Sequence, residues 1–381
     1  MAAAALATLA VAAAMMLLGK NPVAVIGGLM AGPLTDRYRF IEALARACPL
    51  MLCGLAVAVA FRCQAWNIGV EGQYLAGAMA VAAVGITAGN WPGWVLVPAM
   101  LVAAAGAGAI WALPAAWLEY RRRVPLVLST ILLNFVAINL VRYLAGGPLQ
   151  GPDKSAPESA LIAPQAYLQP MVPGTDFHWG FVLAVLAAAG LWVLLRWATA
   201  GFALRAAGLN PVAAEWAGIR VGQVKVGVMA LSGALGGLAG GMQLAGVHHL
   251  LRDDAAEGFG YVGIAVALLG GLNPLGVAVA AVALGMLDIG AMHLERQSAL
   301  GVPAEVSQVI KGVLILTLLA AAGIPRAWVP RLFRGGGAIS LPDSGNRSPI
   351  LERMGHPGPE RTGHPDPSFA CTPPKEPRHH A

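Results

Sequence analysis

Long apolar stretches follow one another along the chain, separated by short segments rich in charged or turn-forming residues. Most of them are long enough for a helix, which rises about 1.5 Å per residue, to cross a hydrocarbon core about 30 Å thick. In a bilayer every backbone polar group has to be satisfied within the chain, so the pattern predicts an all-α, polytopic membrane bundle. The ten expected helical segments are residues 2–19, 43–61, 67–88, 94–118, 125–145, 179–197, 224–246, 259–271, 275–292 and 306–322.

The eighth segment is too short for a full crossing. It holds about 13 residues before Asn273 and Pro274 interrupt it, so a helix there covers only about 20 Å. Irregular backbone at membrane depth has to be shielded from lipid by protein. We therefore expect segments eight and nine to form a broken or re-entrant pair among the other helices.

The composition excludes a soluble fold. Of the 381 residues, 57% are hydrophobic and only 12% are charged, against about 25% charged in an ordinary soluble domain. The net charge of +6 would suit nucleic acid, but the basic residues are scattered along the flanks of the apolar segments and form no single patch. We expect no nucleic-acid partner and interpret these residues as signals of topology.

Lysine and arginine concentrate on one side of the bundle if the ten segments alternate in direction. The groups on that side are Arg121, Arg122 and Arg123; Arg196, Arg205, Arg220 and Lys225; and Arg326, Arg331 and Arg334. The positive-inside rule assigns this side to the cytoplasm, which puts both termini inside and the proline-rich loop 146–178 outside. Lys20, Arg37 and Arg39 fall on the outer side, so the asymmetry is incomplete.

Two parts of different composition are expected. Residues 1–334 form the membrane domain, with a cytoplasmic loop at about 198–222, and residues 335–381 form a polar tail with too few apolar residues to fold. The first apolar segment lacks the positive start of a secretory signal, so we expect it to remain as a span. Cys48, Cys53, Cys63 and Cys371 have no metal-binding spacing, and neither a metal site nor a catalytic residue is assigned.

Polar residues gather at the start of the third segment, in residues 67–73 (N-I-G-V-E-G-Q). Asn67 can cap the helix, and Glu71 in its first turn complements the positive end of the helix dipole. Alternatively, Asn67, Glu71 and Gln73 line a polar path, because such side chains are tolerated in a membrane where they face protein or water. Both interpretations are open on the residues alone.

The cytoplasmic loop contains the signals of a short helix. Asn210 is a good N-cap, Pro211 a good first residue and Gly218 a good terminator. A helix of about two turns is not stable alone in water, so either the membrane surface or a groove of a partner protein has to hold it. Its small residues and one protruding side chain, Trp216, suit close docking.

Other polar or glycine-rich positions carry weaker signals. The glycine-rich stretch 232–241 lacks the lysine of a phosphate-binding loop and predicts close helix packing. Asp288 and Lys311, in segments nine and ten, could pair or line a polar path. With Glu71 they would serve an ion-coupled secondary transporter, which is the alternative function; a structural or enzymatic membrane subunit is the third.

Four stretches together resemble the permease subunits of bacterial ABC importers, in the branch for nucleosides and for simple sugars such as ribose. They occur in the expected order at residues 67–73; at 130–137 (T-I-L-L-N-F-V-A); at 201–218, with L-R-A-A-G-L-N-P-V-A-A at 204–214; and at 258–274. The resemblance covers about residues 20–330. The chain departs from the family at Leu126, where a glutamate is usual, and in the tail after 335.

The resemblance implies a permease of the bacterial plasma membrane that works with a separate ATPase, a second permease, identical or different, and an extracytoplasmic binding protein, often a lipoprotein. This chain would bind no cofactor, and ATP would be used by the ATPase. Asn67, Glu71, Gln73 and Asn134 become candidates to line the substrate path. The loop that contacts the ATPase would be formed by Arg205, Gly208, Asn210, Pro211, Ala213, Ala214, Glu215 and Gly218.

Overall fold

The computed structural model describes residues 16, 27–29, 31–152, 154, 156–296, 312–313 and 316. The chain divides into two units, Met1–Pro325 and Arg326–Ala381, and all described residues belong to the first. The expected first and tenth spans lie almost wholly outside the described residues, and so does the whole polar tail. The predicted boundary at 334/335 therefore stays a prediction.

The described part of the chain is built from helices. Seven of these are long and apolar enough to cross a membrane, which confirms the predicted fold class. The span-length helices are α3 (Arg37–Arg62), α4 (Val70–Thr87), α5 (Gly93–Arg122), α6 (Leu126–Ala145), α7 (Gly180–Trp197), α10 (Val221–Gln243) and α12 (Pro274–Arg296). The shorter elements are η1 (Gly32–Leu34), η2 (Pro164–Ala166), α8 (Thr199–Leu209), α9 (Pro211–Trp216), the π-helical turn η3 (Leu244–His248) and α11 (Phe259–Leu269).

Local residue choices set several of these helix ends. Asp36 caps α3 by accepting a hydrogen bond from the backbone N–H of Tyr38 at 3.2 Å. Arg123 ends α5 in the left-handed conformation, with φ +56°, and Pro125 immediately precedes α6, where a proline disfavours helix in the residue before it. The breaks between the spans are therefore encoded locally.

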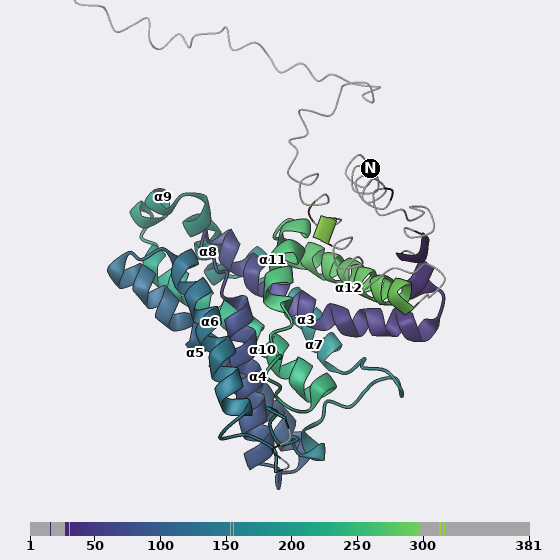
Figure 1. Cartoon of the computed structure of the whole chain (residues 1–381). Helices are drawn as coiled ribbons and strands as arrows, with labels where there is room; N and C mark the ends of the chain where they lie inside the picture. Colours follow the sequence, from purple (N-terminus) through teal and green to yellow (C-terminus); the bar gives the residue numbers. More distant parts are fainter. Residues whose placement is uncertain are drawn as a thin grey trace, which may run out of the picture. The chain divides into compact units, whose positions relative to one another are not determined.

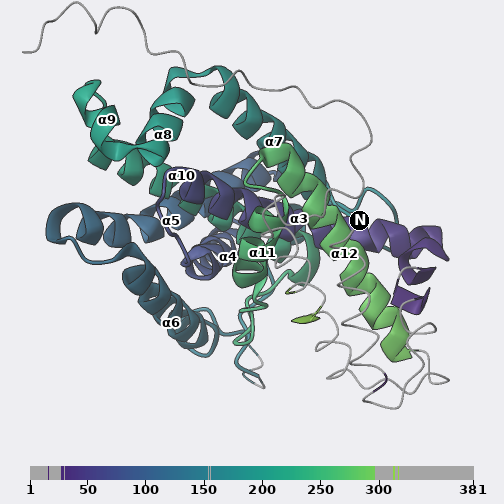
Figure 2. The same cartoon turned by 90° about the horizontal axis from the view of Figure 1, so that it is seen from above.

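Helix α3 is the most buried of the spans, and α10 packs against α3, α4 and α5 (Figure 1). The outward faces are apolar instead: on α6, Leu128, Leu132 and Phe135 are all more than half exposed. A bundle that is apolar both inside and outside is suited to lipid and not to water. Seen from above, α12 lies across α3 (Figure 2).

Glycines in α10 allow it to lie with its backbone against the backbones of α4 and α5. A Cβ atom at Gly240 would lie 1.9 Å from the carbonyl oxygen of Tyr74, and one at Gly237 would lie 2.2 Å from that of Ala104. Neither position has room for a side chain. The prediction of close packing by the stretch 232–241 is confirmed.

Gly240→Ala is expected to lower the free energy of unfolding by about 1–3 kcal/mol, because the methyl group forces α10 away from α4. Gly227→Ala, on the same helix, is the matched control, since a Cβ there meets nothing within 4 Å and alanine favours helix by about 0.5–1 kcal/mol. Thermal unfolding of both purified variants checks the difference. Equal melting temperatures would contradict the backbone contact.

The two ends of the bundle are occupied by different segments. At one end Gly208 of α8 packs on the carbonyl of Arg62, the last residue of α3. At the other end loop 146–178 packs on α4, where the N–H of Ala163 donates to the carbonyl of Gly85 at 3.1 Å. Segment 198–222 and loop 146–178 therefore lie at opposite ends, as the alternation of spans predicts.

His178 anchors the long loop to the end of the bundle. Its ring is buried against Gly246, and its Nδ1 accepts a hydrogen bond from the N–H of Gly180 at 3.0 Å. Burial lowers the pKa of His178 to about 4, so the ring is neutral and Nδ1 is free to accept that bond. The loop is thereby fixed to the start of α7.

The chain crosses between α10 and α12 as irregular backbone followed by a half-helix. Leu251 lies at the end occupied by loop 146–178, where its N–H donates to Ser159 Oγ at 2.9 Å. Helix α11, which covers about 16 Å, then leads to Leu272, whose carbonyl accepts from Arg62 Nε at 2.7 Å at the opposite end. Of the two arrangements predicted, the structure shows a broken crossing, and α12 is a continuous span.

Candidate functional site in the centre of the bundle

The four polar residues predicted to line a path are all buried within the bundle. Asn67, Glu71, Gln73 and Asn134 are at most 1% exposed. Buried polar groups are costly unless they are hydrogen-bonded, and the bonds that these side chains make join the four helices α4, α6, α10 and α11.

Glu71 binds the start of α11. Its Oε1 accepts a hydrogen bond from the N–H of Gly258 at 2.9 Å, and its Oε2 accepts one from Gly260 at 2.7 Å. Gly258 has φ +79°, a conformation that glycine adopts easily. The carboxylate therefore satisfies free N–H groups of α11 and faces the positive end of its dipole. Glu71 also lies in the first turn of its own helix, α4, as predicted.

Of the two interpretations left open for Asn67, the one in which it caps α4 is wrong. The N-cap of that helix is Gly69, which has no side chain to make a cap bond. Asn67 Oδ1 accepts from the N–H of Gly69 at 2.9 Å, while its Nδ2 donates to Ser232 Oγ at 2.9 Å. Nδ2 also lies 3.1 Å from Gln73 Oε1. Asn67 thus joins α4 to α10.

Two residues of this network, Ser232 and Tyr261, were not predicted as site residues. Ser232 of α10 donates to the carbonyl of Ala56 in α3 at 2.6 Å. Asn134 of α6 accepts from Gly72 at 2.8 Å and donates to Tyr261 Oη of α11 at 3.2 Å. A hydroxyl within an otherwise apolar stretch was the available signal for both Ser232 and Tyr261.

The geometry of this network shows which part of the bundle it holds in place. It holds the first turn of a half-helix deep in the bundle, with a carboxylate on its N–H groups and the Asn134 amide on the hydroxyl of Tyr261. Among the described residues no group of three or more histidine, cysteine or acidic side chains is placed to hold a metal ion. The role of Asn67, Glu71, Gln73 and Asn134 in a substrate path remains a prediction.

A second candidate site lies at the end of the bundle that carries α8 and α9. Asn210 Oδ1 accepts from the N–H of Ala213 at 3.0 Å, Pro211 is the first residue of α9, and Gly218 has φ +84°. The predicted short helix is confirmed. Helix α8, which precedes it, was expected to be loop; Leu204, Ala207 and Gly208, spaced three and four apart on its buried face, were the signal for it.

The residues predicted to contact an ATPase divide into two groups. Gly208 and Ala214 are buried and Arg205 is partly buried, so these hold the segment to the bundle. The exposed members of the predicted set are Asn210, Pro211, Ala213, Glu215 and Gly218.

Beside these exposed residues lie large apolar side chains that the sequence indicated only in part. Leu209, Val212 and Trp216 are 85%, 62% and 89% exposed, and of the three only Trp216 was predicted. Exposed apolar residues gathered at one place indicate a surface that another molecule covers. We call Leu209, Val212 and Trp216 the α8–α9 patch.

The structure describes only one of the two residues that were predicted to pair in the alternative, ion-coupled mechanism. Asp288 lies on α12 and is partly buried, whereas Lys311 lies outside the described residues. Their pairing therefore stays a prediction.

Residues 39–319 match the protein family described as the branched-chain amino acid transport system permease component. A guanosine ABC transporter permease of Bacillus subtilis (strain 168) is 36% identical over 81% of this chain and 89% of its own length. A glucose ABC transporter permease of Haloferax volcanii is also 36% identical, over 83% and 85%. A nucleoside ABC transporter permease of Lactococcus lactis is 27% identical, over 79% and 84%.

Proposed function

This chain belongs to the family of branched-chain amino acid transport system permease components and is a permease subunit of an ABC importer, and from this premise we propose that it imports a nucleoside or a simple sugar. The relatives that support the proposal are permeases for guanosine, glucose and nucleosides. The family does not favour the ion-coupled carrier.

We assign each partner of the importer to a part of this chain. An ATPase, which uses the ATP while this chain binds no cofactor, docks on the α8–α9 patch. A second permease, identical or paralogous, completes the translocation path in the membrane lipid. An extracytoplasmic binding protein, a lipoprotein in many such systems, delivers the substrate on the side of loop 146–178.

Charged and aromatic residues indicate which side of the membrane each end of the bundle faces. The end with α8 and α9 carries the arginine cluster at 121–123, so it faces the cytoplasm of a bacterial plasma membrane, and both termini are assigned to that side. Exposed aromatic rings lie towards both ends of the spans, as is typical of membrane interfaces. These are Trp91, Trp94 and Trp179 at one end and Trp117, Tyr120 and Trp197 at the other.

In the proposed mechanism, ATP binding to the ATPase moves α8 and α9, and the spans rearrange to open the path alternately to each side. The ATPase can shift this equilibrium only by binding the two states with different affinity. The broken crossing at α11 is the structural observation that carries the proposal, because half-helices within a membrane commonly mark the substrate path.

Uptake of labelled guanosine and glucose by proteoliposomes that contain the assembled importer tests the proposal. We expect uptake to require ATP and to survive a protonophore. An ATPase partner with its phosphate-binding lysine replaced is the control and should show no uptake. Uptake that persists without ATP and collapses with the proton gradient would instead establish the carrier.

A further inference from the structure

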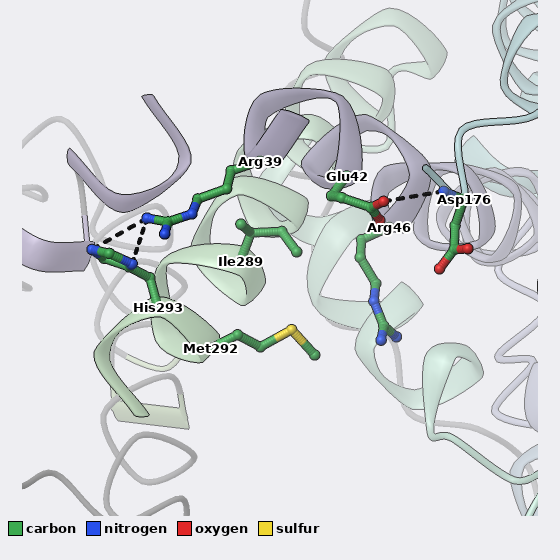
Figure 3. A pocket seen from close by; sticks show the side chains of 7 residues that line it. All are labelled: Arg39, Glu42, Arg46, Asp176, Ile289, Met292 and His293. Carbon is green, nitrogen blue, oxygen red and sulfur yellow. Dashed lines mark hydrogen bonds between the residues drawn. The ribbon is translucent and has the colours of Figure 1, made fainter. Parts of the chain in front are cut away.

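A charged cavity opens between α3, α12 and the loop before α7, at the end of the bundle opposite α8 and α9 (Figure 3). Its volume is about 360 Å³, and its polar lining includes Arg39, Glu42, Arg46 and Asp176. Ile289 and Met292 of α12 form an apolar wall. Pockets for small molecules begin at about 300 Å³ and combine apolar walls with a few placed polar groups.

The charged side chains of α3 share one face of that helix and are held by neighbours. Residues 39, 42 and 46 are spaced three and four apart, which places them on one side of a helix. Arg39 Nη1 lies 2.6 Å from His293 Nδ1, and Glu42 Oε1 accepts from the N–H of Asp176 at 3.1 Å. Figure 3 shows Arg46 and Met292 extending into the space between α3 and α12.

The cavity continues towards the centre of the bundle. Arg46 and Met292 also line an adjoining cavity of about 240 Å³ that reaches Phe259, the first residue of α11. Arg46 lies 3.5 Å from Glu257 there. The two cavities therefore lead from the outer end of α3 to the half-helix whose N–H groups bind Glu71.

The charges of the outer cavity select the class of ligand. The charges of two guanidinium groups and two carboxylates sum to zero. A charged ligand therefore meets as many like charges as opposite ones. A neutral ligand with several hydroxyl groups can accept hydrogen bonds from the arginines and donate to the carboxylates. The adjoining cavity adds the carboxylates of Glu257, Asp288 and Glu295, which disfavour a phosphorylated ligand.

We propose that this cavity is the outer binding site for a neutral polyhydroxylated ring compound, a nucleoside or a sugar, with Arg46 donating to its hydroxyl groups and Met292 packing on its ring. The proposal rests on the proposed import function and adds the residues that receive the substrate. It places the first contact of the substrate on α3 and α12, away from the amide side chains of the central network.

Protection from a thiol reagent tests occupancy directly. In the assembled importer, with Cys371→Ser, a Met292→Cys variant should react with a membrane-impermeant reagent, because Cys48, Cys53 and Cys63 are buried. Guanosine or glucose should slow this reaction at least about threefold, whereas guanosine monophosphate should not. Leu161→Cys, in the exposed outer loop, is the control and should show no protection.

Transport by an Arg46→Met variant tests the role of the charge. We expect the initial uptake rate to fall about tenfold, the loss expected for one charged hydrogen-bonding partner. Arg37→Met is the matched control on the same helix, since Arg37 is exposed and does not line the cavity. Reaction of Met292→Cys in the Arg46→Met background checks that the cavity still forms; guanosine protection should be lost there.

The outcomes separate this site from the import function. If the wild-type importer takes up guanosine with ATP but nothing protects Met292→Cys, and Arg46→Met behaves like Arg37→Met, the site is wrong and the function stands. Protection by guanosine monophosphate alone also overturns the site. If the wild type shows no ATP-dependent uptake, the function fails, while protection by guanosine would still support the site.

Discussion

Glu71→Ala is expected to abolish uptake and to lower the free energy of unfolding by about 3–5 kcal/mol. The substitution removes the acceptors of the partly buried N–H group of Gly258 and the buried N–H group of Gly260, and an unsatisfied buried group costs about 1–3 kcal/mol. The first turn of α11 also loses the negative charge that faces its dipole. No other described side chain is hydrogen-bonded to these two N–H groups.

Glu71→Gln separates anchoring from path lining, because the amide keeps one acceptor oxygen and loses the charge. If Glu71 anchors α11, hydrogen exchange at Gly258 and Gly260 accelerates and the melting temperature falls together with uptake. Glu158→Gln, in the outer loop, is the control and should change neither, because Glu158 is partly exposed and its contact with Arg252, at 3.7 Å, is also partly exposed. Lost uptake with unchanged exchange and stability would mean that Glu71 contacts the substrate and is no anchor.

The second large effect is expected at the α8–α9 patch. Trp216→Ala together with Val212→Ala should reduce association with the ATPase more than about thirtyfold, because a buried aromatic anchor at an interface is commonly worth at least about 2 kcal/mol. Both side chains are exposed in this chain, so the bundle should remain folded. Co-purification of the ATPase and ATP-dependent uptake measure the effect.

Trp197→Ala is the matched control for that experiment, since Trp197 is 73% exposed at the end of α7 and lies outside the patch. If the ATPase co-purified with the double variant as well as with the wild type, α9 would not be its docking site. Gly208 is unsuited to this test, although the sequence indicated it: a Cβ there would lie 1.9 Å from the carbonyl oxygen of Arg62. A bulky residue would displace α8 from α3 and confuse docking with folding.

Features decided by neighbouring residues were predictable from the sequence. The expected span 125–145 is α6, Leu126–Ala145, and the expected span 179–197 is α7, Gly180–Trp197. Apolar length and flanking charge suffice for such helices. The N-cap of α9 was predictable for the same reason, because the group that Asn210 binds, the N–H of Ala213, lies only three residues away.

Features that depend on distant residues were not predictable. Asn67 has the spacing of a cap, yet its partner Ser232 lies 165 residues away, and that partner turns the side chain to α10. The outer cavity was missed for the same reason. Arg39 was assigned to membrane topology, and its position in a cavity depends on α12 bringing His293 beside it.

The glycine contacts of α10 determine how a movement travels through this protein. No side chain lies between the backbones of α10 and α4 at Gly240, so none can change rotamer to absorb a displacement. Helix α10 starts five residues after α9 ends and reaches Ser232 about 17 Å further on. We expect a pull on α9 to move α4, α5 and α10 as one rigid block, and the strain to appear where the chain is irregular, between η3 and α11.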